Sequence, residues 1–187
     1  LTGKGLNWGG SLVRPEATGF GNVYFAEEML KTKGQSFKGK RVAISGFGNV
    51  AWGAATKVNQ LGGKVVTISG PDGYIYDEAG ISGEKIDFML ELRASNQDIV
   101  APYAKKFPGS KFVAGKRPWE VAVDVALPCA TQNELNGDDA KTLIKNGCIC
   151  VGEGANMPST PEAMEVFLHA KILFSPGKAS NAGGVAT

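Results

Sequence analysis

The chain has 187 residues, of which 43% are hydrophobic and 20% are charged, a composition typical of one globular domain. The 20 Lys and Arg residues nearly balance the 18 Asp and Glu residues, which argues against a nucleic-acid partner bound through electrostatics. No apolar run is long enough to cross a bilayer and no signal peptide is visible, so we expect no membrane partner.

The first regular element expected along the chain is a helix. Residues 1–15 are rich in glycine and irregular, and Pro15 is suited to open a helix. The pattern predicts that this helix runs to about Lys33, with Gly34 as its stop. Because the chain begins at Leu1 instead of a methionine and ends abruptly, we expect it to be a piece of a longer protein.

A glycine turn after the apolar run 41–45 organises the chain. The turn has the pattern Gly-x-Gly-x-x-Ala, formed by Gly46, Gly48 and Ala51, and a helical pattern follows at once. A second strand pattern at residues 64–69 completes a βαβ unit. In a dinucleotide-binding fold the first glycine makes the tight turn, and the second lets the backbone approach a pyrophosphate. The alternative interpretation is an ordinary strand, turn and helix without a ligand.

After this unit we expect a turn, a short extended arm and two helices. Residues 70–73 have the composition of a turn, and residues 74–76 are interpreted as the arm. Ser82 is predicted to be the N-cap of a helix that runs through Arg93. A second, short helix is expected near residues 97–106.

Strand and helix patterns alternate through the second half of the chain. Residues 121–127 form a near-continuous apolar run, which is typical of a parallel strand covered on both faces. The alternation predicts an α/β fold: a doubly wound, mostly parallel Rossmann-like sheet with helices on both faces, in one dinucleotide-binding domain over residues 1–187. The remaining strands are expected at residues 111–113, 148–151 and 172–174, and the remaining helices at residues 138–145 and from Thr160 and Pro161 onwards.

Ligands of such sheets bind beyond the carboxyl ends of the strands, and this rule selects particular loops. Thr131, Gln132, Asn133 and Asn156 offer donors and acceptors suited to ribose hydroxyls and a carboxamide. For any one loop alone, the alternative is a polar strand end that faces water. The selected loops are residues 46–49, 69–72, 128–133, 152–157 and 175–184.

The three cysteines, Cys129, Cys148 and Cys150, are odd in number and lie in or beside apolar runs. We expect them to be buried, reduced thiols in a cytoplasmic protein. A metal site at Cys148 and Cys150 would need further ligands, and the only histidine, His169, is not spaced to supply one. We therefore expect no bound metal.

Five motifs, in order over essentially the whole chain, are specific enough to indicate a family. They are Gly-Gly-Ser-Leu-Val-Arg-Pro-Glu-Ala-Thr-Gly at residues 9–19, Gly-Phe-Gly-Asn-Val-Ala at 46–51, Leu-Pro-Cys-Ala-Thr-Gln-Asn at 127–133, Glu-Gly-Ala-Asn-Met-Pro at 153–158 and Lys-Ala-Ser-Asn-Ala-Gly-Gly-Val at 178–185. These segments closely resemble the cofactor domain of bacterial-type hexameric glutamate dehydrogenases, in the Glu/Leu/Phe/Val dehydrogenase family.

This resemblance implies roles for particular residues. Thr18 and Asn49 match positions that contact the nicotinamide cofactor. Arg14, Asn181 and Val185 match positions near the nicotinamide and the substrate, with a surface charge as the alternative for Arg14 and core packing as that for Val185. Together, the loops and the resemblance give a cofactor-binding set of Arg14, Thr18, Gly46, Phe47, Gly48, Asn49, Val50, Ser69, Pro71, Asp72, Asn181 and, on the ribose side, Ala130, Thr131, Gln132 and Asn156.

The reaction implied by the resemblance is oxidative deamination of L-glutamate to 2-oxoglutarate and ammonia, with hydride passing to the nicotinamide, and its reverse. In the family, the catalytic lysine and aspartate belong to an N-terminal substrate domain, and further C-terminal helices follow the cofactor domain. We therefore expect no catalytic residue here, cofactor binding without turnover, and a hexamer and glutamate binding only in the full-length enzyme. The alternatives are the cofactor domain of a leucine- or phenylalanine-type dehydrogenase, a non-catalytic nucleotide-sensing or assembly module, and a glycine-rich methyltransferase.

The choice of dinucleotide depends on the end of the second strand pattern. A carboxylate about 20 residues after the glycine turn normally holds the ribose 2′-OH, whereas a basic group accepts the 2′-phosphate of NADP. That strand ends in Ser69, and Asp72 follows on a turn that could bring it back towards the ribose. No Lys or Arg lies between Val65 and Glu84, and Phe47, Pro71 and Asp72 resemble the NAD-preferring branch of the family. NAD is therefore the preferred cofactor, with NADP as the alternative.

Overall fold

The computed structural model describes residues 16–184, which fold around a seven-stranded sheet. The strands lie in the order β4-β3-β2-β1-β5-β6-β7, so the chain extends from β1 towards one edge and later returns to the other side of β1. Neighbouring strands are parallel except at β3, which is antiparallel to both β2 and β4. The strands are β1 (Arg41–Ile44), β2 (Lys64–Gly70), β3 (Gly73–Tyr76), β4 (Lys111–Ala114), β5 (Val125–Leu127), β6 (Cys150–Gly152) and β7 (Leu173–Ser175).

Side chains of the central strands alternate between two apolar cores, one on each face of the sheet. On β1, Val42 and Ile44 belong to one core and Ala43 to the other. On β5, Leu127 and Ala126 divide between the two cores in the same way. Since successive residues of a strand point to opposite faces, an apolar run without polar interruptions is what a sheet covered on both sides requires. The expectation of a doubly wound α/β fold is confirmed.

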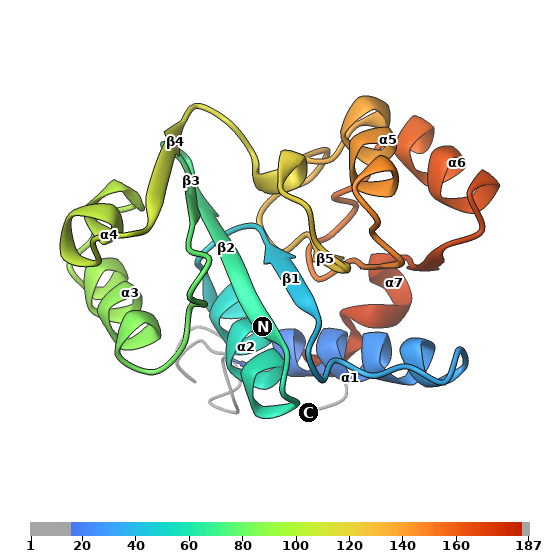
Figure 1. Ribbon diagram of the computed structural model, residues 1–187, viewed down its shortest axis with the longest axis horizontal. Coiled ribbons are helices and arrows are strands. Elements are labelled where there is room, and N and C mark those ends of the chain that lie inside the picture. Colours follow the sequence, from blue (N-terminus) through green and yellow to red (C-terminus); the bar gives the residue numbers. More distant parts are fainter. Residues whose placement is uncertain (1–15, 185–187) are drawn as a thin grey trace, which may run out of the picture.

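Helices cover both faces, as Figure 1 shows with α1 and α2 on one side of the sheet and α5 and α6 on the other. The helix α2 connects the parallel strands β1 and β2, and α3 and α4 lie beside the β3–β4 edge. The helices are α1 (Ala17–Lys31), α2 (Asn49–Gln60), α3 (Glu84–Ala94), α4 (Ala101–Lys106), α5 (Gly137–Lys145), α6 (Pro161–His169) and α7 (Gly177–Ser180), with short 3₁₀ turns η2 (Pro118–Glu120) and η3 (Ala182–Gly184).

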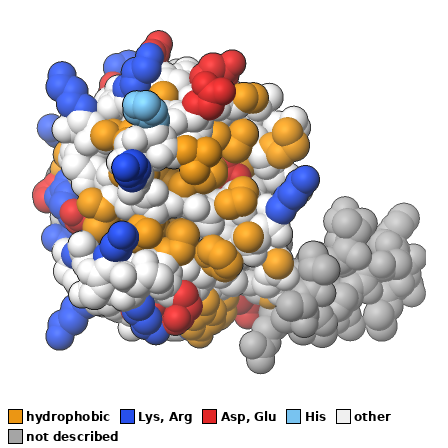
Figure 2. Space-filling model, turned by 90° about the vertical axis from the view of Figure 1, so that its right-hand side faces the viewer, with side chains coloured by type: hydrophobic (Ala, Val, Ile, Leu, Met, Phe, Trp, Pro, Cys, Tyr) orange, Lys and Arg blue, Asp and Glu red, His pale blue; other side chains and the backbone are white. Residues whose placement is uncertain are grey.

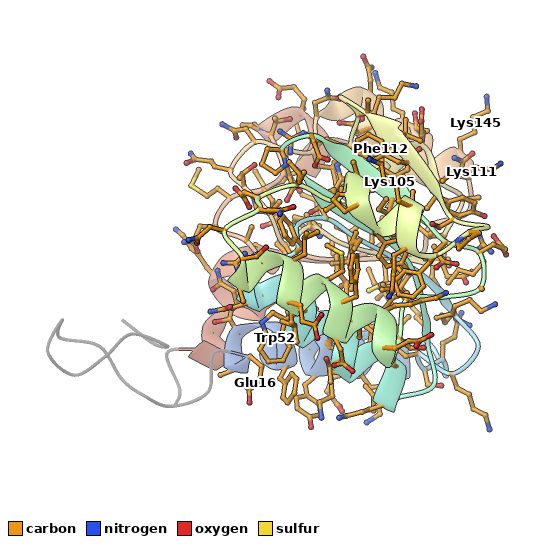
Figure 3. All side chains as sticks on the ribbon, turned by 90° about the vertical axis from the view of Figure 1, so that its left-hand side faces the viewer. Glu16, Trp52, Lys105, Lys111, Phe112 and Lys145 are labelled. Atoms are coloured by element: carbon orange, nitrogen blue, oxygen red, sulfur yellow. The ribbon has the colours of Figure 1, made fainter. Side chains whose placement is uncertain are left out.

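The helices α1 and α2 cross at two glycines. A Cβ on Gly19 would lie 2.3 Å from the carbonyl oxygen of Val50, and a Cβ on Gly53 would lie 2.8 Å from that of Glu16. Only glycine permits this separation, because both contacts are with backbone atoms. Figure 3 shows Glu16 and Trp52 at the same end of the molecule, where the two helices begin. The crossing holds the start of α1 against the first turn of α2.

Three predicted elements differ in the structure. The N-cap of α3 is Gly83, with a φ of 53° and no side-chain cap, so the prediction of Ser82 as N-cap was wrong by one residue. Residues 74–76 are extended as predicted, but they form β3 within the sheet instead of a free arm. The strand expected over residues 121–127 begins only at Val125, because η2 turns the chain and the Asp124 carboxylate accepts a hydrogen bond from the N–H of Arg41 at 2.8 Å.

The surface on the α6 side carries hydrophobic side chains among polar and charged ones (Figure 2). Leu168, at the end of α6, is 65% exposed there. Single apolar side chains on a surface are normal. Within residues 16–184, no helix combines the length and the apolar character needed to cross a bilayer.

Candidate functional site

The sheet order places a crevice between β1 and β5. The chain leaves β1 towards β2 and, after β4 at that edge of the sheet, crosses to β5 on the other side of β1. The loops after β1 and β5 therefore diverge at a topological switch point. A cavity of about 640 Å³ opens at these carboxyl ends. It is lined by Gly46, Phe47, Gly48, Asn49, Val50, Ser69, Gly70, Pro71, Gly73, Arg93, Asp98, Gly115, Lys116, Arg117, Cys129, Ala130 and Thr131.

The glycine turn forms the floor of this crevice. Gly46 has a φ of 81°, and a Cβ there would lie 3.0 Å from the carbonyl oxygen of Cys129. Its N–H donates to the Ser69 hydroxyl at 2.8 Å, which ties the end of β1 to the end of β2. A side chain at position 46 would therefore be strained and would push β1 away from β5.

The helix α2 begins at the crevice with an open N-terminus. Gly48 is its N-cap, and within the described residues no side chain accepts from the N–H groups of its first turn. Four N–H groups at the start of any helix lack partners inside the helix, and together with the helix dipole they attract an anion. This end of α2 is therefore suited to a pyrophosphate or another small anion.

Three cations from distant segments border the crevice. Arg93 of α3 lies 5.9 Å from the ring centroid of Phe47, and a Cβ on Gly48 would be 3.1 Å from its Nη1. Lys116 pairs with Glu120 at 3.0 Å and Arg117 with Glu134 at 3.5 Å, whereas Arg93 forms no ion pair within residues 16–184. Three cations with Asp98 as the bordering acid favour a negatively charged ligand.

The Asp72 carboxylate, which was expected to contact the ribose, is hydrogen-bonded to backbone N–H groups in the structure. It accepts hydrogen bonds from the N–H groups of Val100 and Ala101 at 2.9 and 3.0 Å. These N–H groups belong to Val100, the N-cap of α4, and to Ala101, the first residue of the helix. Val100 has no polar side chain that could cap the helix. Among the residues that line the cavity are Pro71 and Gly73, on either side of Asp72, but not Asp72 itself.

A buried carboxylate supports the loop after β5. Glu134 Oε1 accepts a hydrogen bond from the N–H of Ala130 at 3.0 Å, and its carbonyl oxygen accepts one from the indole of the buried Trp119 at 3.2 Å. Burial raises the pKa of the Glu134 carboxyl, against the opposing effects of Ser45, local N–H groups and Arg117. The loop also bonds to the neighbouring one, since the N–H of Asn133 donates to the carbonyl oxygen of Met157 at 3.0 Å.

Two side-chain amides form a hydrogen bond beyond the carboxyl ends of β6 and β7. Asn181 Nδ2 donates to Asn156 Oδ1 at 2.7 Å, which joins the loop after β6 to the end of α7. Thr18 is half-buried in the first turn of α1, next to the glycine crossing with α2. These residues lie outside the cavity lining, as does the exposed Gln132.

The structure thus divides the expected cofactor-binding residues into three groups. Nine line the cavity: Gly46, Phe47, Gly48, Asn49, Val50, Ser69, Pro71, Ala130 and Thr131. Thr18, Asp72, Gln132, Asn156 and Asn181 lie elsewhere, and Arg14 is outside the described residues. Val185, which was expected near the substrate, is also outside the described residues.

Sequence reasoning missed Arg93, Lys116, Arg117 and Glu134, which come to the crevice from outside the selected motifs or from their margins. Glu134 could have been noticed, because it directly follows the polar loop at residues 131–133. The cations had no local signal, since α3 and the turn after β4 reach the crevice only in the folded sheet.

The three cysteines lie in the apolar cores, as their sequence context predicted. Cys129, Cys148 and Cys150 are free and buried, and burial raises the pKa of each thiol. A neutral buried thiol is a poor nucleophile. Among residues 16–184, no cluster of His, Cys, Asp and Glu could hold a metal ion.

The sheet order and the crevice at its switch point define the class of doubly wound α/β domains, in which ligands bind beyond the carboxyl ends of the strands. The sequence model of the Glutamate/Leucine/Phenylalanine/Valine dehydrogenase family matches residues 9–187, and the chain belongs to this family. The resemblance seen in the sequence motifs is confirmed.

Individual relatives agree with this membership. The chain is 74% identical over 187 residues to a protein of Bacteroides fragilis named NAD-specific glutamate dehydrogenase, and it spans 42% of that protein's length. It is 57% identical over 187 residues to a protein of Haemophilus influenzae named NADP-specific glutamate dehydrogenase, of which it spans 41%. The crystal structure of Plasmodium falciparum glutamate dehydrogenase superimposes with a TM-score of 0.92 at 44% identity, over 100% of this chain and 40% of that one.

Proposed function

We propose that this chain is the dinucleotide-binding domain of a glutamate dehydrogenase. The observation that carries the proposal is the glycine turn at the switch point, which presents the uncapped N-terminus of α2 to a crevice bordered by three cations. The relatives with matching sequences are named glutamate dehydrogenases, and the chain spans less than half of each. The proposed activity of the full-length enzyme is oxidative deamination of L-glutamate to 2-oxoglutarate and ammonia, and its reverse.

The residues present fit a nicotinamide dinucleotide. The first-turn N–H groups of α2 would hold the pyrophosphate, and the absence of a side chain at Gly48 leaves room for its approach. Ser69 and Pro71 would border the adenosine ribose, while Thr18, Gln132, Asn156 and Asn181 are proposed to serve the nicotinamide half. When bound, the dinucleotide would supply the hydride acceptor. The chain's own work is then to bind and orient it.

No group in residues 16–184 is assigned a catalytic role. The catalytic lysine and aspartate are proposed to lie in the part of the enzyme outside this chain, with Arg14, Asn181 and Val185 near the substrate. We also propose a hexameric full-length enzyme in the cytoplasm, a reducing compartment with which the three buried free cysteines are consistent. A leucine- or phenylalanine-type substrate remains the alternative, because the substrate pocket is not in this chain.

For the cofactor, we propose that NAD is preferred and that NADP is also bound. The name of the relative at 74% identity supports the preference for NAD. The physical argument for this preference changes with the structure, because the Asp72 carboxylate caps α4. In addition, Arg93 lies at the crevice and forms no ion pair among the described residues. A cation there would attract the extra phosphate of NADP and narrow the difference between the two cofactors.

The substitution Asn49→Asp tests the binding site. It adds a negative charge to the first turn of α2, which stabilises a helix N-terminus by about 0.3–1 kcal/mol but repels a pyrophosphate. The Asn49 amide oxygen that accepts from the Trp52 indole at 3.4 Å is retained as a carboxylate oxygen. We expect unchanged or higher thermal stability with NADH affinity reduced about tenfold or more in calorimetry.

The control is Gln60→Glu, which makes the same charge change at the exposed C-terminal end of α2, beside Lys57. NADH affinity should stay at the level of the unsubstituted chain. The unsubstituted chain should bind NADH saturably and form no NADH from NAD and glutamate. Equal affinities for the Asn49→Asp variant and the unsubstituted chain would contradict the assigned pyrophosphate position, and the absence of saturable binding would contradict the proposed function.

A further inference from the structure

A buried carboxylate joins the two loops beyond β6 and β7. Glu153 directly follows β6 and is 3% exposed. Its Oε2 accepts a hydrogen bond from the N–H of Gly177 at 2.7 Å, and its Oε1 accepts one from the N–H of Ser159 at 3.3 Å. Gly177 is the first residue of α7, and Ser159 lies in the loop that leads to α6. One side chain therefore fixes two segments that are 18 residues apart in sequence.

The backbone of Glu153 adds two further hydrogen bonds, both to the segment formed by β7 and α7. Its N–H donates to the carbonyl oxygen of Ser175 at 3.2 Å, and its carbonyl oxygen accepts from the hydroxyl of Ser180 at 2.5 Å. Within residues 16–184, Glu153 forms no ion pair, and its two carboxylate oxygens accept hydrogen bonds from backbone N–H groups. A carboxylate suits this position because both of its oxygens accept, whereas an amide offers one acceptor and one donor.

The two segments that Glu153 joins carry the amides Asn156 and Asn181. Asn156 lies between Glu153 and Ser159, and Asn181 is the C-cap of α7. Their mutual hydrogen bond at 2.7 Å uses the Asn156 oxygen and the Asn181 nitrogen. It leaves the Asn156 amide nitrogen as a donor and the Asn181 amide oxygen as an acceptor. A primary carboxamide, with one acceptor and one donor, is complementary to that arrangement.

The spacing between the loops is narrow. A Cβ on Gly177 would lie 2.7 Å from the carbonyl oxygen of Ala155 and 3.5 Å from Asn181 Nδ2. A shift of either loop would therefore alter the distance between the two amides. The buried Glu153 carboxylate fixes that distance through its bonds to Ser159 and Gly177, while Asn156 itself is exposed.

We propose that Glu153 is a positioning residue for the nicotinamide half of the dinucleotide, because it holds the Asn156–Asn181 pair in the geometry that receives the carboxamide. This inference rests on the proposed function. Glu153 does not touch the ligand but acts through the two loops.

The test compares NADH with ADP-ribose, which keeps the adenosine, the pyrophosphate and the second ribose but has no nicotinamide. In Glu153→Gln, one backbone N–H keeps its acceptor and the other meets an amide N–H₂ group. Leaving a buried donor without an acceptor should lower NADH affinity about tenfold. ADP-ribose affinity should stay within about twofold, because ADP-ribose lacks the carboxamide that the Asn156–Asn181 pair is proposed to receive. A purely structural role would weaken both ligands together.

Two further variants make the comparison specific. Glu165→Gln removes an exposed carboxylate on the neighbouring α6 and should change neither affinity. Asn181→Ala should weaken NADH selectively, and adding Glu153→Gln to it should cost little more, because both act through the same pair. If Glu153→Gln does not fold, Ser180→Ala replaces it, since it releases α7 from the Glu153 carbonyl.

The outcomes distinguish a failure of the role inferred for Glu153 from a failure of the proposed dinucleotide binding. A selective loss of NADH affinity in Glu153→Gln, or in Ser180→Ala, supports the inference. Equal losses for NADH and ADP-ribose, or no loss for either, overturn it and leave the proposed function intact. Failure of the unsubstituted chain to bind ADP-ribose overturns the proposed function, and the inference with it.

Discussion

The Asp72 carboxylate caps α4 by accepting the N–H of Val100 through Oδ1 at 2.9 Å and through Oδ2 at 3.1 Å. The capping group thus comes from the turn between β2 and β3, 28 residues before the N-cap of the helix that it caps. The bond fixes the β2–β3 turn against α4, and Pro71 and Gly73 of that turn line the crevice. Asp72 therefore shapes the rim of the crevice, although its carboxylate is not part of the cavity lining.

The first prediction follows from this cap. Asp72→Ala should lower the free energy of unfolding by about 1 kcal/mol, the usual cost of a lost N-cap. Asp72→Asn should cost less, because one amide oxygen still accepts. Urea denaturation at neutral pH measures both. Asp98→Ala, at an exposed carboxylate on the same rim, is the control and should change stability by less than about 0.5 kcal/mol. Equal losses for Asp72→Ala and Asp98→Ala would contradict a capping role.

The second prediction concerns the glycine turn. Gly46→Ala combines the backbone strain of a φ of 81° with a Cβ contact of 3.0 Å to a carbonyl oxygen. Gly34→Ala has a similar φ of 66° but no atom within 4 Å of its Cβ. Gly34→Ala should cost about 1 kcal/mol, and Gly46→Ala should cost clearly more, in the range of about 2–4 kcal/mol. Thermal and urea unfolding measure the difference, and only Gly46→Ala should also abolish NADH binding. Equal unfolding free energies would show that β5 can move away from the turn.

The third prediction concerns Arg93 and the choice of cofactor. Arg93→Gln should reduce NADPH affinity about five- to tenfold and NADH affinity less than about twofold, since the charge serves the additional phosphate. The difference should shrink as salt is raised, because Arg93 is exposed. Lys141→Gln, on the distant α5, removes the same charge and is the control. An identical loss for both cofactors would place Arg93 at the shared pyrophosphate instead.

The fourth prediction concerns pH. Because burial raises the pKa of Glu134 in the folded state, the folded protein holds that proton more tightly than the unfolded chain. The Glu134 carboxyl therefore makes its full stabilising contribution below its pKa in the unfolded chain. This contribution is lost as pH rises through its pKa in the folded protein. A glutamine does not titrate, so Glu134→Gln should gain stability relative to the unsubstituted protein between pH 4 and neutral pH. Urea unfolding across that range measures the trend.

Glu120 is the control, because its pKa is shifted in the opposite direction from that of Glu134. Hydrogen bonds from Lys116 and Tyr74 lower its pKa, so its contribution is present above the unfolded pKa and is lost as pH falls through the folded one. Glu120→Gln should therefore lose relative stability as pH rises over the same interval. If both variants followed the same trend, the difference in burial between these carboxyls would not govern their titration.

The sequence by itself determined the features that depend on neighbouring residues. The apolar runs at residues 41–45, 121–127 and 148–151 predicted strands. The run at 121–127 further predicted a strand covered on both faces, because a strand between two cores needs apolar side chains on both faces. The Gly46–Gly48 turn predicted the start of α2, since glycines and a following helical period are a local signal. The five motifs indicated the family that the comparisons then confirmed. Even so, boundaries shifted where a distant partner intervened, as at Asp124 and Arg41.

Only the tertiary structure decided which charges meet at the crevice. Arg93 and Lys116 lie far along the chain from Gly48, and neither belongs to a motif, so their approach depends on how α3 and β4 pack at the sheet edge. Asp72 was expected at a ribose and instead caps α4, because a carboxylate bonds to whichever free N–H groups the fold brings near it. Glu153 carried no periodic signal either, and its role is visible only once Ser159 and Gly177 stand on either side of it. Hydrophobic periodicity is a property of adjacent positions, whereas hydrogen bonds and charges act through space, and their partners are set by the fold.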